Sequence, residues 1–371
     1  MKIALLTFHN AANYGAALQA FALQKALDEK GYENVYINYQ NEHRINSYSV
    51  SYLVLSAVKK FDIKGAMRYL AGSPFLLQRK TRFNTFYRRN LRCTKRIYNS
   101  SSEAESLNDQ YTKFIVGSDQ VWNWSNNGAD DSYLLSFVKD NNKKISYSSS
   151  FGVAEISDDL KAVYQMYLSE FSHLAVREQH GIEIVKGLIG RNPRLVLDPV
   201  FLLSKEQWLT IADAKKFNDR FIFSYTNKPN QLEKFLSTTN LDLTDTYLYK
   251  LSRNIKISDF LDKTVKVKYT MSPSKFLSVV RDAELIVSAS FHCVSLAIIL
   301  NKPFVAILTG NRGKDERLTN ILSLLDLNNR IYSENMTKED IKRPIDYDRV
   351  NIKIEELKLS SLEYLWNAIE S

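Results

Sequence analysis

The segment 285–296 carries the residues best suited to chemistry on an anionic ligand. Its sequence, LIVSASFHCVSL, predicts a buried strand, a turn of small residues and a helix that begins close to His292. The backbone N–H groups and the macrodipole at the start of a helix favour a bound anion. Ser290 and His292 would meet that anion, and an imidazole placed there can act as a general acid. The alternative is a structural role, the usual one for a lone histidine.

A basic loop lies a little further along the chain, where residues 311–318 read NRGKDERL and are predicted to enter a helix. Its three cations are Arg312, Lys314 and Arg317, and each could hold a phosphate or a carboxylate. A solvated loop is the alternative.

Arg177 is a further candidate for an anion contact. It follows a predicted strand at 174–176 and stands before a helical pattern. Its guanidinium could hold a carboxylate or a phosphate through two hydrogen bonds. The alternative is a salt bridge to Glu178 or to another acid.

Two other segments, each after a predicted strand, combine polar and aromatic side chains that suit a sugar. Carboxamides and phenols can hydrogen-bond to sugar hydroxyls, and indole faces suit a pyranose ring. The alternatives are an ordinary turn with an Asn cap in the first segment, and a buried Trp anchor in the second. The residues concerned are His9, Asn10, Asn13, Tyr14, Asp119, Gln120, Trp122 and Asn123.

Short apolar runs alternate with helical patterns along the chain, and these elements must position the candidate residues. Residues 2–8 predict a buried strand, 15–30 a helix that stops at Gly31, and 35–39 a second strand. Such a β-α-β opening implies a parallel sheet. Further strands are predicted at 114–116, 145–149, 174–176, 195–197, 221–225, 246–249, 265–269, 285–288 and 304–308.

Two successive β/α series predict an α/β fold with two Rossmann-like, doubly wound domains that face a cleft. We expect an N-terminal domain at 1–200, with a basic helical excursion at about 41–110. We expect a C-terminal domain at 201–371, in which Ser272 caps one helix and Ser360 caps the last.

Composition excludes several classes of protein. The 371 residues include only two cysteines, which excludes a disulfide scaffold, and no spacing suggests zinc. Neither a GxGxxG nor a P-loop signature occurs. We find no signal peptide and no apolar run long enough to span a bilayer, so we expect a cytoplasmic protein.

The net charge of +9 favours anionic partners and is concentrated between residues 59 and 96. That stretch holds twelve Lys or Arg and a single acid, Asp62. It could contact an anionic membrane surface or a phosphate-bearing acceptor, and a solvated basic face is the alternative. No nucleic-acid motif accompanies it, so nucleic acid is not expected.

Taken together, these segments resemble the polysaccharide pyruvyl transferase family. The resemblance follows nearly the whole chain, in order, through TFHNAANYGAALQAFALQKAL, FIVGSDQVWN, YSSSFG, AVRE, VLDPVFLL and VSASFHCVSLAIILNKPF. The family is similar to GT-B glycosyltransferases in having two Rossmann-like domains around a cleft. This chain has Ser290 where some members have Arg, and Cys293 where many have Gly or Ala.

The resemblance implies a transferase that moves a pyruvyl group from phosphoenolpyruvate to a sugar of a bacterial surface polysaccharide, such as a capsule or exopolysaccharide. It implies that Arg177, His292 and Arg317 contact the donor, with Ser290, Arg312 and Lys314 beside them. Phosphoenolpyruvate is then a co-substrate, and neither a cofactor nor a metal is expected. The acceptor would be a sugar linked to polyprenyl phosphate, bound by the first domain, with peripheral contact at the inner membrane face through residues 59–96.

Two other functions remain open at this point. One is a GT-B-like glycosyltransferase that uses a nucleotide sugar in the same cleft. The other is a non-catalytic carbohydrate-binding protein that keeps the fold.

Overall fold

The computed structural model describes the chain except residues 216, 227–228 and 253–262, and the side chains of Pro229 and Lys314 also lie outside the described part. Contacts divide the chain into two compact units, a first unit of Met1–Ser49, Asn84–Leu203 and Glu355–Ser371, and a second unit of Val50–Phe83 and Ser204–Ile354. The domain boundary that we predict near residue 200 compares with a change of unit between Leu203 and Ser204. Residues 50–83 group with the second unit, and the C-terminal 355–371 group with the first.

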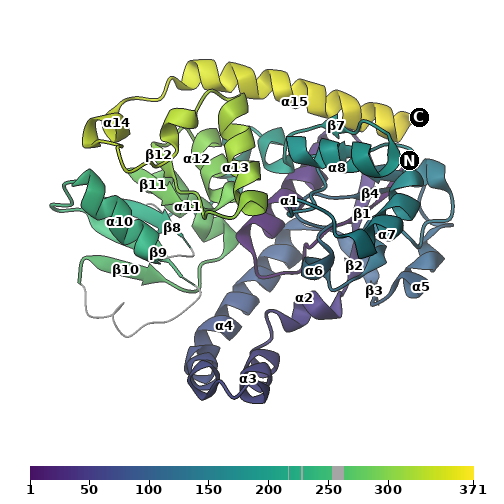
Figure 1. Ribbon diagram of the computed structural model, residues 1–371, viewed down its shortest axis with the longest axis horizontal. Helices are drawn as coiled ribbons and strands as arrows, with labels where there is room; N and C mark the ends of the chain where they lie inside the picture. The colour runs from purple at the N-terminus through teal and green to yellow at the C-terminus, as the bar shows by residue number, and fades with distance from the viewer. Residues whose placement is uncertain (216, 227–228, 253–262) are drawn as a thin grey trace. The chain divides into compact units, whose positions relative to one another are not determined.

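The first unit is built on a parallel five-stranded sheet (Figure 1). Its strands are β1 (Lys2–Leu6), β2 (Glu33–Tyr39), β3 (Cys93–Tyr98), β4 (Lys113–Val116) and β5 (Lys144–Ser146). They lie in the order β3-β2-β1-β4-β5, and each pairing is parallel. Residues 3–6 of β1 and all of β4 are buried, as expected for central strands covered on both faces.

Strand β3 is not among the predicted strands, because residues 41–110 are expected to be helical. It lies at the edge of the sheet and leaves Lys95, Arg96 and Ile97 exposed. A charged edge strand carries little of the apolar signal that identifies a buried one. The helices of this excursion are α2 (Glu42–Asn46), α3 (Val50–Lys59) and α4 (Ile63–Asn90).

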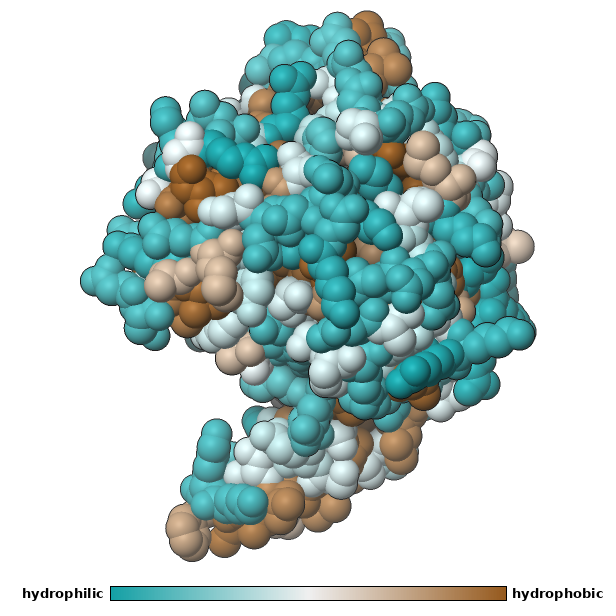
Figure 2. All heavy atoms as spheres, turned by 90° about the vertical axis from the view of Figure 1, so that its right-hand side faces the viewer, coloured by the Kyte–Doolittle hydropathy of each residue, from teal (hydrophilic) through white to brown (hydrophobic). Residues whose placement is uncertain are grey.

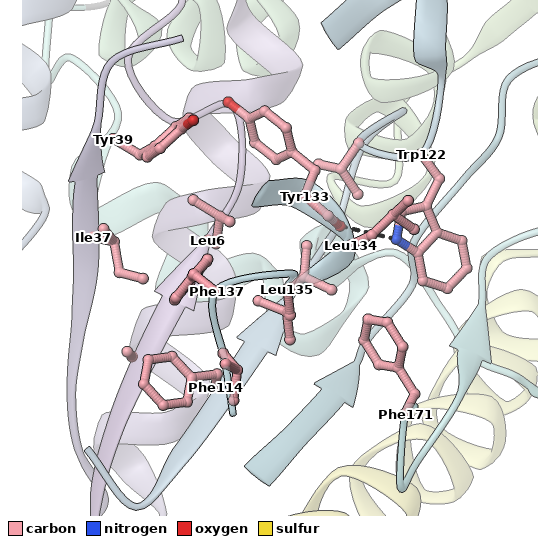
Figure 3. Close-up of a cluster of buried hydrophobic side chains, with 14 of the residues drawn as sticks. Leu6, Ile37, Tyr39, Phe114, Trp122, Tyr133, Leu134, Leu135, Phe137 and Phe171 are labelled. Carbon is pink, nitrogen blue, oxygen red and sulfur yellow. Dashed lines mark hydrogen bonds between the residues drawn. The ribbon is translucent and has the colours of Figure 1, made fainter. Parts of the chain in front are cut away.

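The core of the first unit lies between this sheet and the helices around it. Figure 3 shows Leu6, Phe114 and Phe137 packed together, with Trp122 beside Phe171. The indole nitrogen of Trp122 donates a hydrogen bond to the carbonyl oxygen of Tyr133 at 3.1 Å. The remaining elements of this unit are α1 (Tyr14–Glu29), α5 (Ser101–Ala104), α6 (Trp124–Asn127), α7 (Asp158–Ser169), β6 (Ala175–Val176), α8 (Gln179–Ile189) and β7 (Arg194–Leu195).

The second unit repeats the topology of the first. Its strands are β8 (Phe221–Tyr225), β9 (Tyr247–Leu251), β10 (Val265–Lys268), β11 (Leu285–Ser288) and β12 (Phe304–Ala306). They lie in the order β10-β9-β8-β11-β12, again with parallel pairings. Its helices are α9 (Lys205–Ile211), α10 (Pro229–Thr239), α11 (Pro273–Asp282), α12 (Phe291–Ile299), α13 (Arg312–Leu324) and α14 (Lys338–Lys342). The predicted α/β class with two Rossmann-like domains is confirmed.

Two predicted helix caps have different outcomes. Ser272 caps α11 as expected, since its hydroxyl accepts a hydrogen bond from the Lys275 amide at 3.1 Å. Ser360 does not cap the last helix, because it lies inside α15 (Tyr347–Glu370). The apolar stripe of α15 begins earlier, with Val350 and Ile354 buried, so the helix starts well before the serine.

No helix in the described part of the chain is both long and apolar enough to cross a membrane.

Candidate functional site

The carboxyl edge of the second sheet holds the start of α12. The Ser288 hydroxyl, at the end of β11, donates to the Tyr225 carbonyl at 2.8 Å and accepts from the Ser290 amide at 3.0 Å. These bonds fix the turn from strand to helix. Ser290 occupies the cap position in an extended conformation, but its side chain makes no capping hydrogen bond. The Ser290 side chain therefore does not close the first turn of α12, and the start of a helix favours a bound anion.

His292 and Arg317 both lie beside the Phe291 ring at this turn. The His292 ring is buried, with 8% of the residue exposed, and it meets the Phe291 ring edge-on at 5.0 Å between centroids. The guanidinium of Arg317, from α13, lies over the same Phe291 ring at 5.9 Å. Phe291 thus links a histidine and a cation that are far apart in the sequence. Cys293 is fully buried, and burial raises the pKa of its thiol to about 12, which disfavours the reactive thiolate form.

The loop between β12 and α13 is held by Asp315. Its carboxylate accepts hydrogen bonds from the Thr309 amide at 2.8 Å, the Thr309 hydroxyl at 2.7 Å and the Gly310 amide at 2.7 Å. Asp315, the acidic residue in the first turn of α13, therefore hydrogen-bonds to the preceding loop. Arg312 begins the helix and is exposed. Lys314 falls within the helix, and its side chain lies outside the described residues.

In the first unit, Arg177 forms a buried ion pair with Asp198, which is not among the predicted site residues. Its NH1 donates to Asp198 Oδ2 at 2.6 Å, and its Nε lies 3.6 Å from Glu178 Oε2. Side-chain exposure is 2% for Arg177 and 0% for Asp198. The nearby carboxylates of Asp198, Glu178 and Asp119 raise the pKa of Arg177 against the opposing effect of desolvation. The geometry therefore favours the salt-bridge alternative for Arg177.

A network of hydrogen bonds joins the Arg177–Asp198 pair to the loop that follows β4. The Ser118 hydroxyl donates to Asp198 Oδ2 at 2.9 Å, and the Ser118 carbonyl accepts from the Thr7 hydroxyl at 3.0 Å. The Gln19 amide group donates to that Thr7 hydroxyl at 2.9 Å. Gly117, with φ +126°, is required here, since a Cβ would come within 2.0 Å of the Tyr147 carbonyl oxygen.

Three buried polar groups lie on the two loops that meet at this edge. Gln120 Nε2, Ser148 Oγ and Ser150 Oγ have no hydrogen-bond partner among the described residues. Each such group costs about 1–3 kcal/mol when it is left unsatisfied, so these three are candidates for contact with a polar ligand. Asp119, beside Gln120, adopts φ +70°. Its carboxylate accepts a hydrogen bond from the backbone N–H of Gln120 at 2.8 Å.

The other predicted sugar-binding residues mostly have structural roles. His9 is buried and stacked on Tyr36 at 5.3 Å, with Nδ1 3.2 Å from the Thr7 carbonyl oxygen, and burial lowers its pKa to about 4. Tyr14 and Trp122 are also buried. Asn13 and Asn123 cap α1 and α6, and half-buried Asn10 donates to the Tyr39 carbonyl at 2.8 Å. A fully buried indole has no face to offer a pyranose, so Trp122 is an anchor of the core.

Three further residues of these two sites are not among the candidates predicted from the sequence: Asp198, Ser118 and Phe291. A signal for Asp198 exists, because it follows the predicted strand at 195–197 as part of VLDPVFLL. A carboxylate in that position belongs to the ligand-binding edge of a parallel sheet. Ser118 and Phe291 carry no such signal, because their roles depend on partners that are distant in the sequence.

Comparison with known proteins gives a family and a fold. The family model described as polysaccharide pyruvyl transferase matches residues 13–311. No curated protein matches the chain. Among solved structures, the Neisseria meningitidis UDP-GlcNAc 2-epimerase bound to UDP-GlcNAc is 10% identical, with a TM-score of 0.52, and covers 99% of this chain and 100% of that one. The S. aureus MnaA–UDP co-structure is 12% identical, with a TM-score of 0.50, and covers 100% and 97%. These likenesses support a GT-B-type fold.

Proposed function

Because this chain belongs to the polysaccharide pyruvyl transferase family, we propose that it transfers a pyruvyl group from phosphoenolpyruvate to two hydroxyls of one sugar. The product is a ketal, and phosphate is released. The observation that carries this proposal is the position of both His292 and Arg317 beside the Phe291 ring at the start of α12.

The donor has a carboxylate and a phosphate and therefore needs positive electrostatic potential. The first-turn amides of α12, together with Arg317 and Arg312, supply it in our scheme. Lys314 belongs to the same proposed donor side by its place in the sequence. The half-buried Ser290 stands at the cap position and would hydrogen-bond to the bound anion.

His292 is the proposed general acid. A proton delivered to C3 of the enol converts the CH2 group to CH3 and leaves an oxocarbenium-like centre at C2. The first sugar hydroxyl attacks C2 and loses its proton. Phosphate then departs with the C2–O bond electrons, helped by Arg317, and the second hydroxyl closes the ring at C2. Of the two hydroxyl protons, one replaces the proton given to C3 and the other leaves with phosphate, so no oxidant or reductant is involved.

The acceptor sugar is assigned to the first unit. Carboxylates and unsatisfied hydroxyl and amide groups at its sheet edge, notably Asp119, Gln120 and Ser150, match sugar hydroxyls better than they match a doubly charged anion. Arg177, neutralised by Asp198, would be a positioning residue there and not a donor contact. No cofactor or metal is part of the scheme.

We further propose that the sugar is carried on polyprenyl phosphate, as an intermediate of a capsule or exopolysaccharide, at the inner face of the membrane. The basic stretch 59–96 supports this proposal, because its charge suits an anionic lipid surface.

Incubation with phosphoenolpyruvate and lipid-linked sugar extracts tests the proposal. We expect phosphate release, together with a sugar product heavier by one pyruvyl ketal. Phosphoenolpyruvate at about 100 times its dissociation constant should also stabilise the protein by roughly 2.7 kcal/mol. The His292→Ala variant is the matched negative control.

A nucleotide sugar is the second candidate donor, since both solved structures above contain UDP or UDP-GlcNAc in their own proteins. Stabilisation by UDP without any response to phosphoenolpyruvate would favour a glycosyltransferase. A response to neither ligand, with no phosphate release, would favour a non-catalytic carbohydrate-binding protein.

A further inference from the structure

Helix α3 and the first half of α4 expose an unusual amount of apolar side chain. Of the sixteen large hydrophobic residues that are exposed in the described structure, nine lie between residues 52 and 77. On α4 they form one stripe, with Ile63 71% exposed, Met67 65%, Leu70 57% and Leu77 56%. Spacings of four, three and seven residues place these side chains on one face of the helix. Figure 2 shows hydrophobic side chains gathered over the lower tip, where Figure 1 places α3 and the start of α4.

The turn between the two helices carries the most exposed of these side chains. Phe61 is 91% exposed and adopts φ +57°. The Asp62 amide bonds to the Ala57 carbonyl at 2.9 Å, and the Phe61 amide bonds to the Val58 carbonyl at 2.9 Å. This is the Schellman end of a helix, and Phe61 occupies the left-handed position that glycine or asparagine usually fills. Neither backbone preference nor burial accounts for a phenylalanine at this place.

The charges around this tip are almost all positive. Lys59, Lys60, Lys64 and Arg68 are exposed. The one acid, Asp62, accepts a hydrogen bond from the Gly65 amide at 2.8 Å and so closes the first turn of α4. Apolar side chains ringed by cations are typical of a segment that lies in the interface of an anionic bilayer.

We propose that the α3–α4 tip, residues 52–70, docks on anionic lipid by inserting Phe61, Ile63 and Met67 below the headgroups. Lys59, Lys60 and Lys64 then contact the lipid phosphates. This binding does not depend on the reaction proposed above, so it can be tested and can fail separately from that reaction.

A second copy of the chain is the less favourable occupant. Two such tips packed together would bring eight or more cations face to face, and like charges at an interface are strongly disfavoured. The later cations of the basic stretch are also less suitable for the membrane. Arg92 is held by Asp28 in an ion pair, and residues 93–98 form the sheet edge β3. We therefore expect the membrane contact at residues 52–70 and not along the whole of 59–96. We also expect apolar side chains to contribute to it.

Flotation of the full-length protein with vesicles tests the proposal. One set of vesicles contains phosphatidylcholine with phosphatidylglycerol, and the other contains phosphatidylcholine alone. We expect the wild type to float with the anionic set at low salt and to be released only partly at high salt, because apolar insertion is not screened. A combined variant, Phe61→Asn with Ile63→Ser and Met67→Ser, should lower the partition coefficient at least about tenfold, given roughly 0.8 kcal/mol per buried CH2.

Two matched variants isolate the contribution of the tip. Ile352→Ser with Leu359→Ser removes apolar side chains that are 62% and 67% exposed on α15, and flotation should be unchanged. Arg88→Glu with Arg89→Glu removes exposed cations of α4 outside the tip, and flotation should change less than twofold. The charge variant Lys59→Glu, Lys60→Glu and Lys64→Glu should lose binding at low salt and serves as a second test if the apolar variant folds poorly.

A tryptophan at position 61 reports insertion directly. Phe61→Trp should be quenched by brominated lipid in anionic vesicles, whereas Leu359→Trp should not. The proposal is overturned if the wild type does not float, if the tip variants float like the wild type, or if quenching is equal at both positions. It is also overturned if light scattering shows a dimer that the apolar variant converts to a monomer, because the occupant would then be a second copy.

Discussion

The carboxyl edges of the two sheets have the same topology but opposite electrostatic character. Both five-stranded sheets follow the same strand order, and each unit has a histidine and an arginine near its sheet edge. In the first unit, His9 follows β1 and Arg177 follows β6 of a separate two-stranded sheet. In the second unit, His292 lies in the first turn of α12 and Arg317 lies in α13. In the first, Arg177 is enclosed by carboxylates, whereas in the second, Arg317 covers an aromatic ring beside a helix start. Residue type alone therefore does not distinguish an anion site from a structural pair.

In the proposed reaction, this difference would place the two substrates on different units. Asp198 and Glu178 balance the charge of Arg177, which disfavours a further anion there, and the polar groups nearby would meet sugar hydroxyls. A helix start without a side-chain cap is suited to a phosphate or a carboxylate.

The largest expected effect is on turnover, from His292→Ala. General acid catalysis contributes about a hundredfold to ten-thousandfold, so turnover should fall by that factor while phosphoenolpyruvate affinity changes little. The matched control is His9→Gln in the first unit, which should keep turnover once its folding is verified. Phosphate release measures both. Equal losses in the two variants would contradict the distinction between the two histidines.

The second effect is on stability, from Arg177→Ala. This change leaves Asp198 and Glu178 buried without their cation, which typically costs about 3–5 kcal/mol. Urea denaturation measures it. Arg349→Ala, which removes an exposed pair with Asp326, should cost less than about 1 kcal/mol. The milder Arg177→Lys should keep phosphoenolpyruvate affinity within about twofold, and a tenfold loss would instead make Arg177 a donor contact.

The third effect is a pH dependence that comes from His9. Burial lowers its pKa to about 4 in the folded state, against an ordinary value of 6.5. As pH falls below 6.5, His9 takes up a proton in the unfolded chain but not in the folded chain. The free energy of unfolding therefore decreases from pH 6.5 down to about 4. The loss amounts to roughly 3 kcal/mol at about 1.4 kcal/mol per pH unit. Denaturation of the wild type and of His9→Gln across this range should show a smaller slope in the variant.

The smallest expected effect separates two cations of the donor side. Arg317→Ala removes a charge-assisted contact worth about 1.5–3 kcal/mol, so phosphoenolpyruvate affinity should fall about tenfold or more. The exposed Arg312 should contribute less, because solvent screens its charge. Titration calorimetry of Arg317→Ala, Arg317→Lys and Arg312→Ala ranks them. A larger loss for Arg312→Ala than for Arg317→Ala would reverse our assignment.

Much of the fold follows from local sequence. Strands β8 and β11 match their predicted bounds, because buried parallel strands are short apolar runs with clear ends. Strand β3 is missed because an edge strand need not be apolar, and Ser360 is misjudged because serine is tolerated inside a helix. The start of α12 close to His292 is predicted because strand, small-residue turn and helix are contiguous in the chain.

Local sequence is sufficient to predict the family motifs, the alternation that gives two parallel sheets, and the position of His292 near the start of a helix. Tertiary folding then selects which candidate residues come together. It paired Arg177 with Asp198, placed Arg317 over Phe291, buried Trp122 and left Phe61 in solvent. The physical reason is that strand and helix signals depend on neighbours in the chain, whereas charge neutralisation and burial depend on groups that only folding brings together.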